Sequence, residues 1–170
     1  LIQPIADLLI KYKLPRILRS LPFLLDPFAG LGFRLVEIAE LSGYFPLGVE
    51  IEPAYVNQAH QRVILGDSTN LTFIQNNSFD AAVTSPVYPN GMADNFKSKS
   101  RDKSKRHTYI HRIREQYPEY ELHPNNTAGT NPRRSEAAYN KFSELNYNVY
   151  KEVFRVLKPG GILAISVPLQ

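Results

Sequence analysis

The chain has 170 residues, of which 43% are hydrophobic, 11% aromatic and 21% charged. This length suits one domain, and the apolar content is enough for a buried core, which excludes a wholly disordered chain. Cysteine is absent, which excludes a thiolate nucleophile, a disulfide framework, an iron–sulfur cluster and cysteine-bound zinc. With no apolar run near the roughly 20 residues that span a bilayer and no secretory signal pattern, we expect a soluble, cytoplasmic protein.

Charge is distributed unevenly along the chain, whose net charge is +4. Ten of the twenty lysines and arginines but only four of the sixteen acids lie between Lys97 and Arg134, so this stretch carries +6 and the rest −2. Such a segment is typical of polyanion binding, although its composition also fits a solvated loop. His107 and His111 have the spacing of a helical metal pair, but no glutamate follows His107, and we expect no metal site.

The first half of the chain alternates apolar runs with helical patterns. Residues 3–20 predict a helical lead-in with a break at Pro15, and the run 21–25 predicts a strand covered on both faces. A glycine-containing turn at 26–32 follows. The other elements expected in this half are a helix at 33–43, a strand at 44–51, a helix opening at Pro53 and extending through 63, and a short strand at 63–67.

The second half predicts two more strands and a long helix. A strand at 80–84 ends before Pro86 and Pro89, and a turn at 158–161 leads into a closing strand at 162–167. Between them, residues 136–157 form a helical pattern with an apolar side made of Tyr139, Phe142, Leu145, Val149, Val153 and Val156. Strands that alternate with helices predict an α/β fold, with a doubly wound, mostly parallel sheet in one domain at 1–170.

The stretch 90–135 interrupts this alternation. A connection of this length within a compact domain is usually either functional or disordered. It leaves the predicted sheet from the carboxyl end of a strand, which is the edge where open parallel sheets bind ligands. Because the stretch is also basic, we interpret 90–135 as a substrate-binding insert, with a partly disordered loop as the alternative.

Acids and glycines follow the first three predicted strands. Gly30 and Gly32 lie in the turn after Asp26, where missing side chains permit a tight turn and a close ligand approach; the third glycine of a dinucleotide fingerprint is absent. Glu50, 24 residues after Asp26, ends the second strand where an acid can bind ribose hydroxyls. Asp67 follows the third strand and can accept a hydrogen bond from an adenine amino group. Alternatively, each acid caps a helix or lies in a solvated turn.

In this order, the segments DPFAGLG, GVEIEP, GDS, FDAAVTSPVYPN and RVLKPGG resemble those of class I S-adenosylmethionine-dependent methyltransferases. More narrowly, they are similar to the cytosine-N4 and adenine-N6 modification methylases, which methylate exocyclic amines of DNA bases in restriction–modification systems. The resemblance covers most of 21–89 and 136–167, and implies a Rossmann-like methyltransferase fold with S-adenosyl-L-methionine as cofactor. The cofactor-binding residues that it implies are Asp26, Phe28, Gly30, Gly32, Glu50 (ribose), Ile51 (adenine) and Asp67.

The segment Ser85-Pro86-Val87-Tyr88 corresponds to the catalytic tetrapeptide of that family, which is usually Ser/Asn/Asp-Pro-Pro-aromatic. An exocyclic amine is a weak nucleophile because its lone pair is delocalised into the ring. Acceptors at the Ser85 side chain and the Pro86 carbonyl would favour a tetrahedral nitrogen and in-line attack on the sulfonium methyl, and Tyr88 would stack on a flipped base. The resemblance implies these three as catalytic residues; a plain strand-ending turn is the alternative.

Two features depart from the family pattern. Val87 replaces the usual second proline, which loosens the turn. The sequence stops after the last predicted strand, where this fold normally adds a helix and an antiparallel hairpin, and its only methionine is Met92. We therefore expect a fragment that lacks the C-terminal hairpin.

The leading hypothesis is a site-specific DNA amino-methyltransferase whose insert grips the duplex through phosphate contacts, with Tyr109, Tyr117 and Tyr120 stacking on bases. The serine-led motif favours cytosine-N4 over adenine-N6, and the absence of cysteine excludes thiolate-dependent methylation at cytosine carbon-5. One alternative is a transfer-RNA base amino-methyltransferase. Another is a nucleic-acid-binding module that has lost activity through Val87. Neither the recognition sequence nor the oligomeric state follows from the sequence, and no membrane partner is expected.

Overall fold

The computed structural model describes residues 21–86, 121, 123–126 and 135–166. The lead-in expected at 3–20, Val87, Tyr88 and most of the basic insert at 90–135 lie outside the described residues, so the predictions for them stay predictions. The chain divides into two compact units, one comprising 1–86 and 148–170 and the other 87–147. The sheet and the candidate site belong to the first unit.

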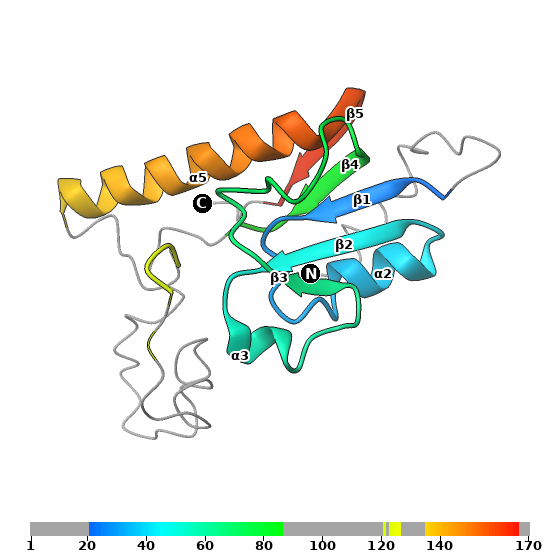
Figure 1. Cartoon of the computed structure of the whole chain (residues 1–170), viewed down its shortest axis with the longest axis horizontal. Helices are drawn as coiled ribbons and strands as arrows, with labels where there is room; N and C mark the ends of the chain where they lie inside the picture. Colours follow the sequence, from blue (N-terminus) through cyan, green and yellow to red (C-terminus); the bar gives the residue numbers. More distant parts are fainter. Residues whose placement is uncertain (1–20, 87–120, 122, 127–134, 167–170) are drawn as a thin grey trace. The chain divides into compact units, whose positions relative to one another are not determined.

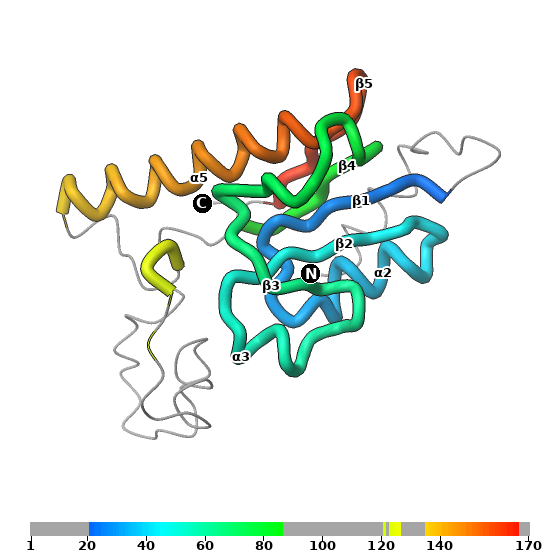
Figure 2. Tube along the Cα trace, viewed as in Figure 1, coloured from blue at the N-terminus to red at the C-terminus, as the bar shows by residue number. Residues whose placement is uncertain are grey.

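Five strands form one parallel sheet in the order β3-β2-β1-β4-β5 (Figure 1). The strands are β1 (Phe23–Asp26), β2 (Phe45–Glu50), β3 (Val63–Leu65), β4 (Phe79–Thr84) and β5 (Leu157–Ile165). From β1 the chain moves outward to β3 and then returns to β4 on the other side of β1 (Figure 2). This order confirms the predicted α/β class and places the switch point of the doubly wound sheet between β1 and β4.

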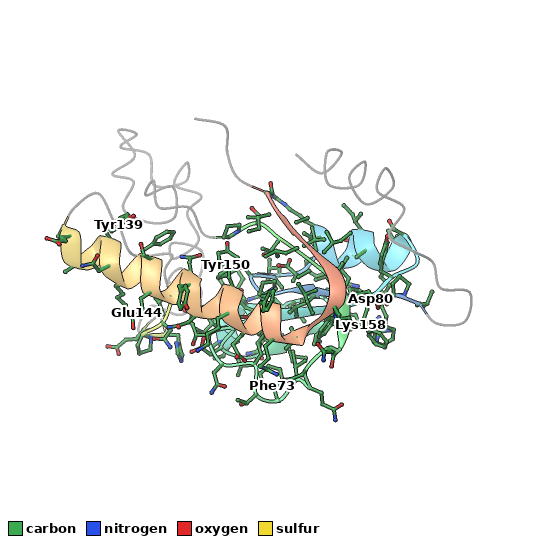
Figure 3. The ribbon with its side chains drawn as sticks, turned by 90° about the horizontal axis from the view of Figure 1, so that it is seen from above. Phe73, Asp80, Tyr139, Glu144, Tyr150 and Lys158 are labelled. Atoms are coloured by element: carbon green, nitrogen blue, oxygen red, sulfur yellow. The ribbon has the colours of Figure 1, made fainter. Side chains whose placement is uncertain are left out.

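Helices cover both faces of the sheet (Figure 3). On one face, α2 (Leu35–Leu41) contributes Leu35 and Ala39 to a core that includes Leu24. On the other face, α5 (Glu136–Val156) contributes Val149, Val153 and Val156, the buried part of its predicted apolar side, to a core that includes Leu25. From the same predicted side, Phe142 and Leu145 are only half-buried and Tyr139 is exposed. Because successive strand residues point to opposite faces, neighbours such as Leu24 and Leu25 stabilise different cores. Burial on both faces explains the uninterrupted apolar run of β1.

The helix expected at 53–63 is much shorter in the structure. α3 covers only Pro53–Val56. Beyond it, the His60 N–H donates to the Leu31 carbonyl at 2.9 Å, and the Gly48 N–H donates to the Arg62 carbonyl at 2.8 Å. These main-chain bonds hold the chain in a loop that delivers Val63 to the edge of β2, so long-range pairing overrides the local helical pattern.

The turn expected at 158–161 is part of β5 rather than a separate connection. Leu157 already pairs with Phe79, and Ile162 pairs with Ala81, so β5 advances five residues while β4 advances two. Gly160 takes a φ of +81°, and a Cβ on Gly161 would lie 2.9 Å from the Lys158 carbonyl oxygen. The two glycines therefore permit an irregularity within the strand, which is why the segment has the composition of a turn.

Candidate functional site

Asp26 joins the ends of the two strands that flank the switch point. It is the last residue of β1 and is 4% exposed. Its Oδ1 accepts hydrogen bonds from the Thr84 hydroxyl at 2.7 Å and from the Phe28 N–H at 3.1 Å. Because Thr84 ends β4, the glycine-rich turn after β1 and the Ser85-Pro86 segment after β4 begin side by side at the carboxyl edge of the sheet.

The electrostatics of Asp26 are unusual. Burial raises the pKa of the Asp26 carboxyl from its ordinary value of 3.8 to about 6, against the opposing effect of the hydrogen bonds from Thr84 and Phe28. The negative charge of Glu50 raises this pKa further. At neutral pH Asp26 is therefore an ionised group inside the protein, an arrangement that is more frequent at functional sites than in structural cores.

The glycine-rich turn has one supported side and one open side. Gly30 and Gly32 adopt φ values of +55° and +73°, in the left-handed region that favours glycine. A Cβ on Gly32 would lie 2.5 Å from Val63 Cγ2, so the turn packs directly against the start of β3. Among the residues that the structure describes, no atom lies within 4 Å of a Cβ built on Gly30. The described part of the chain therefore leaves this side of the turn open, and the predicted approach of a ligand to Gly30 stays a prediction.

The other two predicted acids also lie at the carboxyl edge. Glu50 ends β2, is 6% exposed, and accepts a hydrogen bond from the Glu52 N–H at 2.8 Å. Asp67 follows β3 and accepts hydrogen bonds from the N–H and the hydroxyl of Thr69, at 2.9 and 2.7 Å. Both carboxylates therefore organise local turns, and their position also suits a ligand that lies across the ends of β1, β2 and β3.

The remaining predicted site residues differ from one another in their burial and in their contacts. The Phe28 side chain packs against the core on the α5 face, whereas its main-chain N–H donates a hydrogen bond to Asp26 at the candidate site. Ile51 is half-buried directly after Glu50. Ser85 is exposed and Pro86 is buried, immediately beyond β4. Tyr88 lies outside the described residues, so its predicted role in base stacking stays a prediction.

Three residues that the sequence analysis did not single out hold this edge together. Thr84 is fully buried and bonds Asp26. The Ser68 hydroxyl donates to the Pro27 carbonyl at 2.8 Å, which ties the loop after β3 to the turn after β1. A Cβ on Gly48 would lie 2.6 Å from Ala29 Cβ, so only glycine lets the turn pack on β2. The sequence signal that could have identified these three residues is a small side chain beside each motif at a strand end.

Metal binding and membrane insertion have no support in the described part of the chain. Within residues 21–86, 121, 123–126 and 135–166, no three side chains of the metal-ligating types His, Asp and Glu gather closely enough to hold an ion. Across these same ranges, no helix combines the length and the apolar character needed to cross a membrane. His107 and His111 lie outside these ranges.

Comparisons with known proteins identify the fold. No protein-family model and no curated protein matches the chain. A solved structure from Galdieria sulphuraria, described provisionally as a sarcosine dimethylglycine methyltransferase, matches over 96% of this chain and 46% of its own, with 16% identity and a TM-score of 0.51. A SAM-dependent methyltransferase from Archaeoglobus fulgidus matches over 95% and 51%, with 13% identity and a TM-score of 0.49. The chain thus spans about half the length of these structures. The match to the Galdieria sulphuraria structure, together with the parallel sheet described above, shows the Rossmann-like methyltransferase fold.

Proposed function

We propose that this chain is the cofactor-binding and catalytic part of an S-adenosylmethionine-dependent methyltransferase that acts on an exocyclic amine of a DNA base, with cytosine-N4 favoured over adenine-N6. The observation that carries the proposal is the 2.7 Å hydrogen bond from Thr84 to Asp26. It joins the glycine-rich turn to the Ser85-Pro86 segment across neighbouring parallel strands. A ligand seated on one segment would therefore lie beside a group held by the other.

The groups at this edge fit the chemistry of S-adenosylmethionine. The cofactor combines ribose hydroxyls and an adenine amino group, which are hydrogen-bond donors, with positive charges on its sulfonium and amino groups. Buried or half-buried carboxylates at Asp26, Glu50 and Asp67 supply acceptors and negative charge for these groups. The open main chain at Gly30 lets a bulky ligand approach the turn closely. When bound, the cofactor supplies an activated methyl group on a cationic sulfur.

The Ser85-Pro86 segment would act on the amine. The Ser85 hydroxyl and the Pro86 carbonyl can accept the two amine hydrogens, which favours a tetrahedral nitrogen whose lone pair is available for attack. Methyl transfer to this nitrogen would form a nitrogen–carbon bond at the expense of the carbon–sulfur bond of the donor, and the amine would release one proton to solvent. Ser85 is exposed at the strand end while Thr84 and Pro86 on either side are buried, so the sheet holds the segment that presents this hydroxyl.

Mass spectrometry of nucleosides tests the proposal directly. The protein is incubated with DNA and, separately, with transfer RNA, in each case with methyl-labelled S-adenosylmethionine, and we expect the label in N4-methylcytosine from the DNA. Label in N6-methyladenine would retain the amine chemistry and change the base. Label only in transfer RNA would move the substrate to RNA, and binding of nucleic acid without any transfer would identify a binding module instead of an enzyme.

A further inference from the structure

The glycine-rich turn rests on the loop that precedes β3. The His60 N–H donates to the Leu31 carbonyl at 2.9 Å, and the Phe33 ring lies edge-on to the His60 ring, with their centroids 6.3 Å apart. A Cβ on Gly32 would lie 2.5 Å from Val63 Cγ2 and 3.2 Å from His60 Cβ. The supported side of the turn therefore packs against residues 60–63. The position of the turn depends on the contacts that hold this loop in place.

The His60 side chain connects this loop to α2. Its Nε2 lies 3.2 Å from Oε2 of Glu40, and its Nδ1 accepts a hydrogen bond from the Arg62 N–H at 3.2 Å. Because Nδ1 accepts, the neutral ring carries its proton on Nε2 and donates it to Glu40. Both ring nitrogens are thus used, and the side chain is only 14% exposed, which leaves the ring little freedom to rotate.

Glu40 completes a closed set of contacts. Its other oxygen, Oε1, accepts a hydrogen bond from Nε of Arg62 at 3.1 Å, and the Arg62 guanidinium lies 4.0 Å from the centre of the Phe45 ring at the start of β2. Glu40 lies on α2, whose Glu37 N–H donates to the Gly32 carbonyl at 3.1 Å. The turn is consequently held from both sides, by the helix that follows it and by the loop that the same helix fixes through Glu40.

We propose that Glu40 and His60 form a positioning pair that fixes the main chain of the glycine-rich turn for cofactor binding. This inference rests on the proposed function, because it assigns the pair to the same site. Without the pair, the turn would sample more conformations in the free protein, and a ligand would have to order them on binding. The pair therefore acts on cofactor affinity through the turn, without contacting the cofactor.

The test uses two readouts on the 170-residue chain. Hydrogen exchange of the amides at 29–34 is measured without cofactor, and calorimetry gives the Kd for S-adenosylmethionine. For Glu40→Ala, which removes the hydrogen bond from His60 and the ion pair with Arg62, we expect faster exchange at 29–34 and a Kd raised about fivefold, the size expected for half-buried contacts of a carboxylate. The matched control is Glu37→Ala, which removes an exposed carboxylate from the same helix but keeps the main-chain N–H that donates to Gly32, and should change neither readout.

Two substitutions of His60 test the contacts of its two ring nitrogens one at a time. His60→Gln keeps a donor near the place of Nε2 and should retain wild-type exchange and a Kd within twofold. His60→Asn keeps an acceptor for the Arg62 N–H but cannot reach Glu40, and should behave like Glu40→Ala. Wild-type exchange in Glu40→Ala, or faster exchange with an unchanged Kd, would overturn the proposal. Failure of the wild type to bind S-adenosylmethionine would instead overturn the proposed function, while the exchange result would still report on the turn.

Discussion

The amino and carboxyl edges of the sheet hold their aspartates in different ways. At the amino edge, Asp80 accepts hydrogen bonds from the Lys158 ammonium at 2.7 Å and from the Phe23 N–H at 2.8 Å, and its side chain is 25% exposed (Figure 3). At the carboxyl edge, Asp26 is 4% exposed and accepts hydrogen bonds from the Thr84 hydroxyl and the Phe28 N–H. One aspartate is therefore paired with a cation near solvent, and the other ionises among neutral donors inside the protein.

We interpret this difference as one between a residue that stabilises the fold and a residue that, under the proposed function, binds the cofactor. The ion pair between Asp80 and Lys158 links β4 to β5, and both of its charges stay partly exposed to solvent. The raised pKa of Asp26, from 3.8 to about 6, corresponds to roughly 3 kcal/mol of destabilisation of the ionised form. Such a destabilisation, located at the ligand-binding edge of a parallel sheet, favours a role for Asp26 in binding a ligand rather than in folding.

The largest expected effect comes from removing the charge of Asp26. Asp26→Asn keeps an oxygen that can accept from Thr84 and Phe28, so the turn should remain in place. The affinity for S-adenosylmethionine, measured by calorimetry, should fall on the order of tenfold to a hundredfold, because a charged acceptor is replaced by a neutral one. The matched control is Asp80→Asn at the other edge, which should leave this affinity within twofold. Equal losses in the two variants would remove the distinction between the edges.

The pH dependence of stability should show the same aspartate. Because the native pKa of Asp26 lies above its unfolded value, the native state binds the proton more tightly, and stability falls as pH rises between the two values. The contribution of Asp26 should be greatest below pH 3.8 and should decrease by about 3 kcal/mol as the pH rises through about 6.

Denaturant unfolding of the wild type and of Asp26→Asn across this pH range isolates that contribution, since all other titrating groups are shared. The two proteins should have similar free energies of unfolding near pH 4, and Asp26→Asn should be the more stable of the two at pH 7. A difference that does not vary with pH would show that Asp26 is not the buried titrating group.

Replacing Gly32 and replacing Gly30 should lower the free energy of unfolding by different amounts. Gly32→Ala places a Cβ 2.5 Å from Val63 Cγ2 in a left-handed backbone, and should lower the free energy of unfolding by about 2–3 kcal/mol. Gly30→Ala places a Cβ near no atom of the described residues, and should cost only about 1 kcal/mol of backbone strain while weakening cofactor binding. Thermal or denaturant unfolding, paired with calorimetry, checks both. A larger loss of stability for Gly30→Ala would contradict the assignment of open and supported sides.

The smallest effect is expected at the amino edge. Lys158→Met removes the ion pair with Asp80 and leaves the Phe23 N–H on the other oxygen. Because the Lys158 side chain is 41% exposed, the free energy of unfolding should fall by less than about 1 kcal/mol, and by less still at high salt. Cofactor affinity should not change. If this substitution lowered the cofactor affinity, part of the cofactor site would lie at the amino edge of the sheet, which would contradict the account.

Much of this edge could be predicted from the sequence because three of the described strands are mostly apolar runs that stop at a polar residue. Asp26, Glu50 and Thr84 mark the ends of β1, β2 and β4, and parallel pairing brings those ends together. The parallel order followed from the alternation of strands with helical patterns, and the glycines after β1 indicated where the chain turns most tightly.

The contacts that tie the edge together could not be predicted in the same way. The Thr84–Asp26 and Ser68–Pro27 hydrogen bonds join residues 58 and 41 positions apart, and they depend on the strand register, which no local pattern contains. The prediction of a helix at 53–63 was wrong for a related reason. Its local pattern is overridden by the main-chain bond between His60 and Leu31, two residues that only the finished sheet brings together.

Cross-linking of S-adenosylmethionine tests the central claim most directly, because it reports which edge of the sheet binds the cofactor. After ultraviolet irradiation with the methyl-labelled compound, the protein is digested and the labelled residues are located by fragmentation of the peptides. The account predicts saturable label at residues within 26–34 or 84–86, and its loss in Asp26→Asn but not in Asp80→Asn. Saturable label confined to residues of the amino edge, such as Phe23, Phe45 or Lys158, would contradict it.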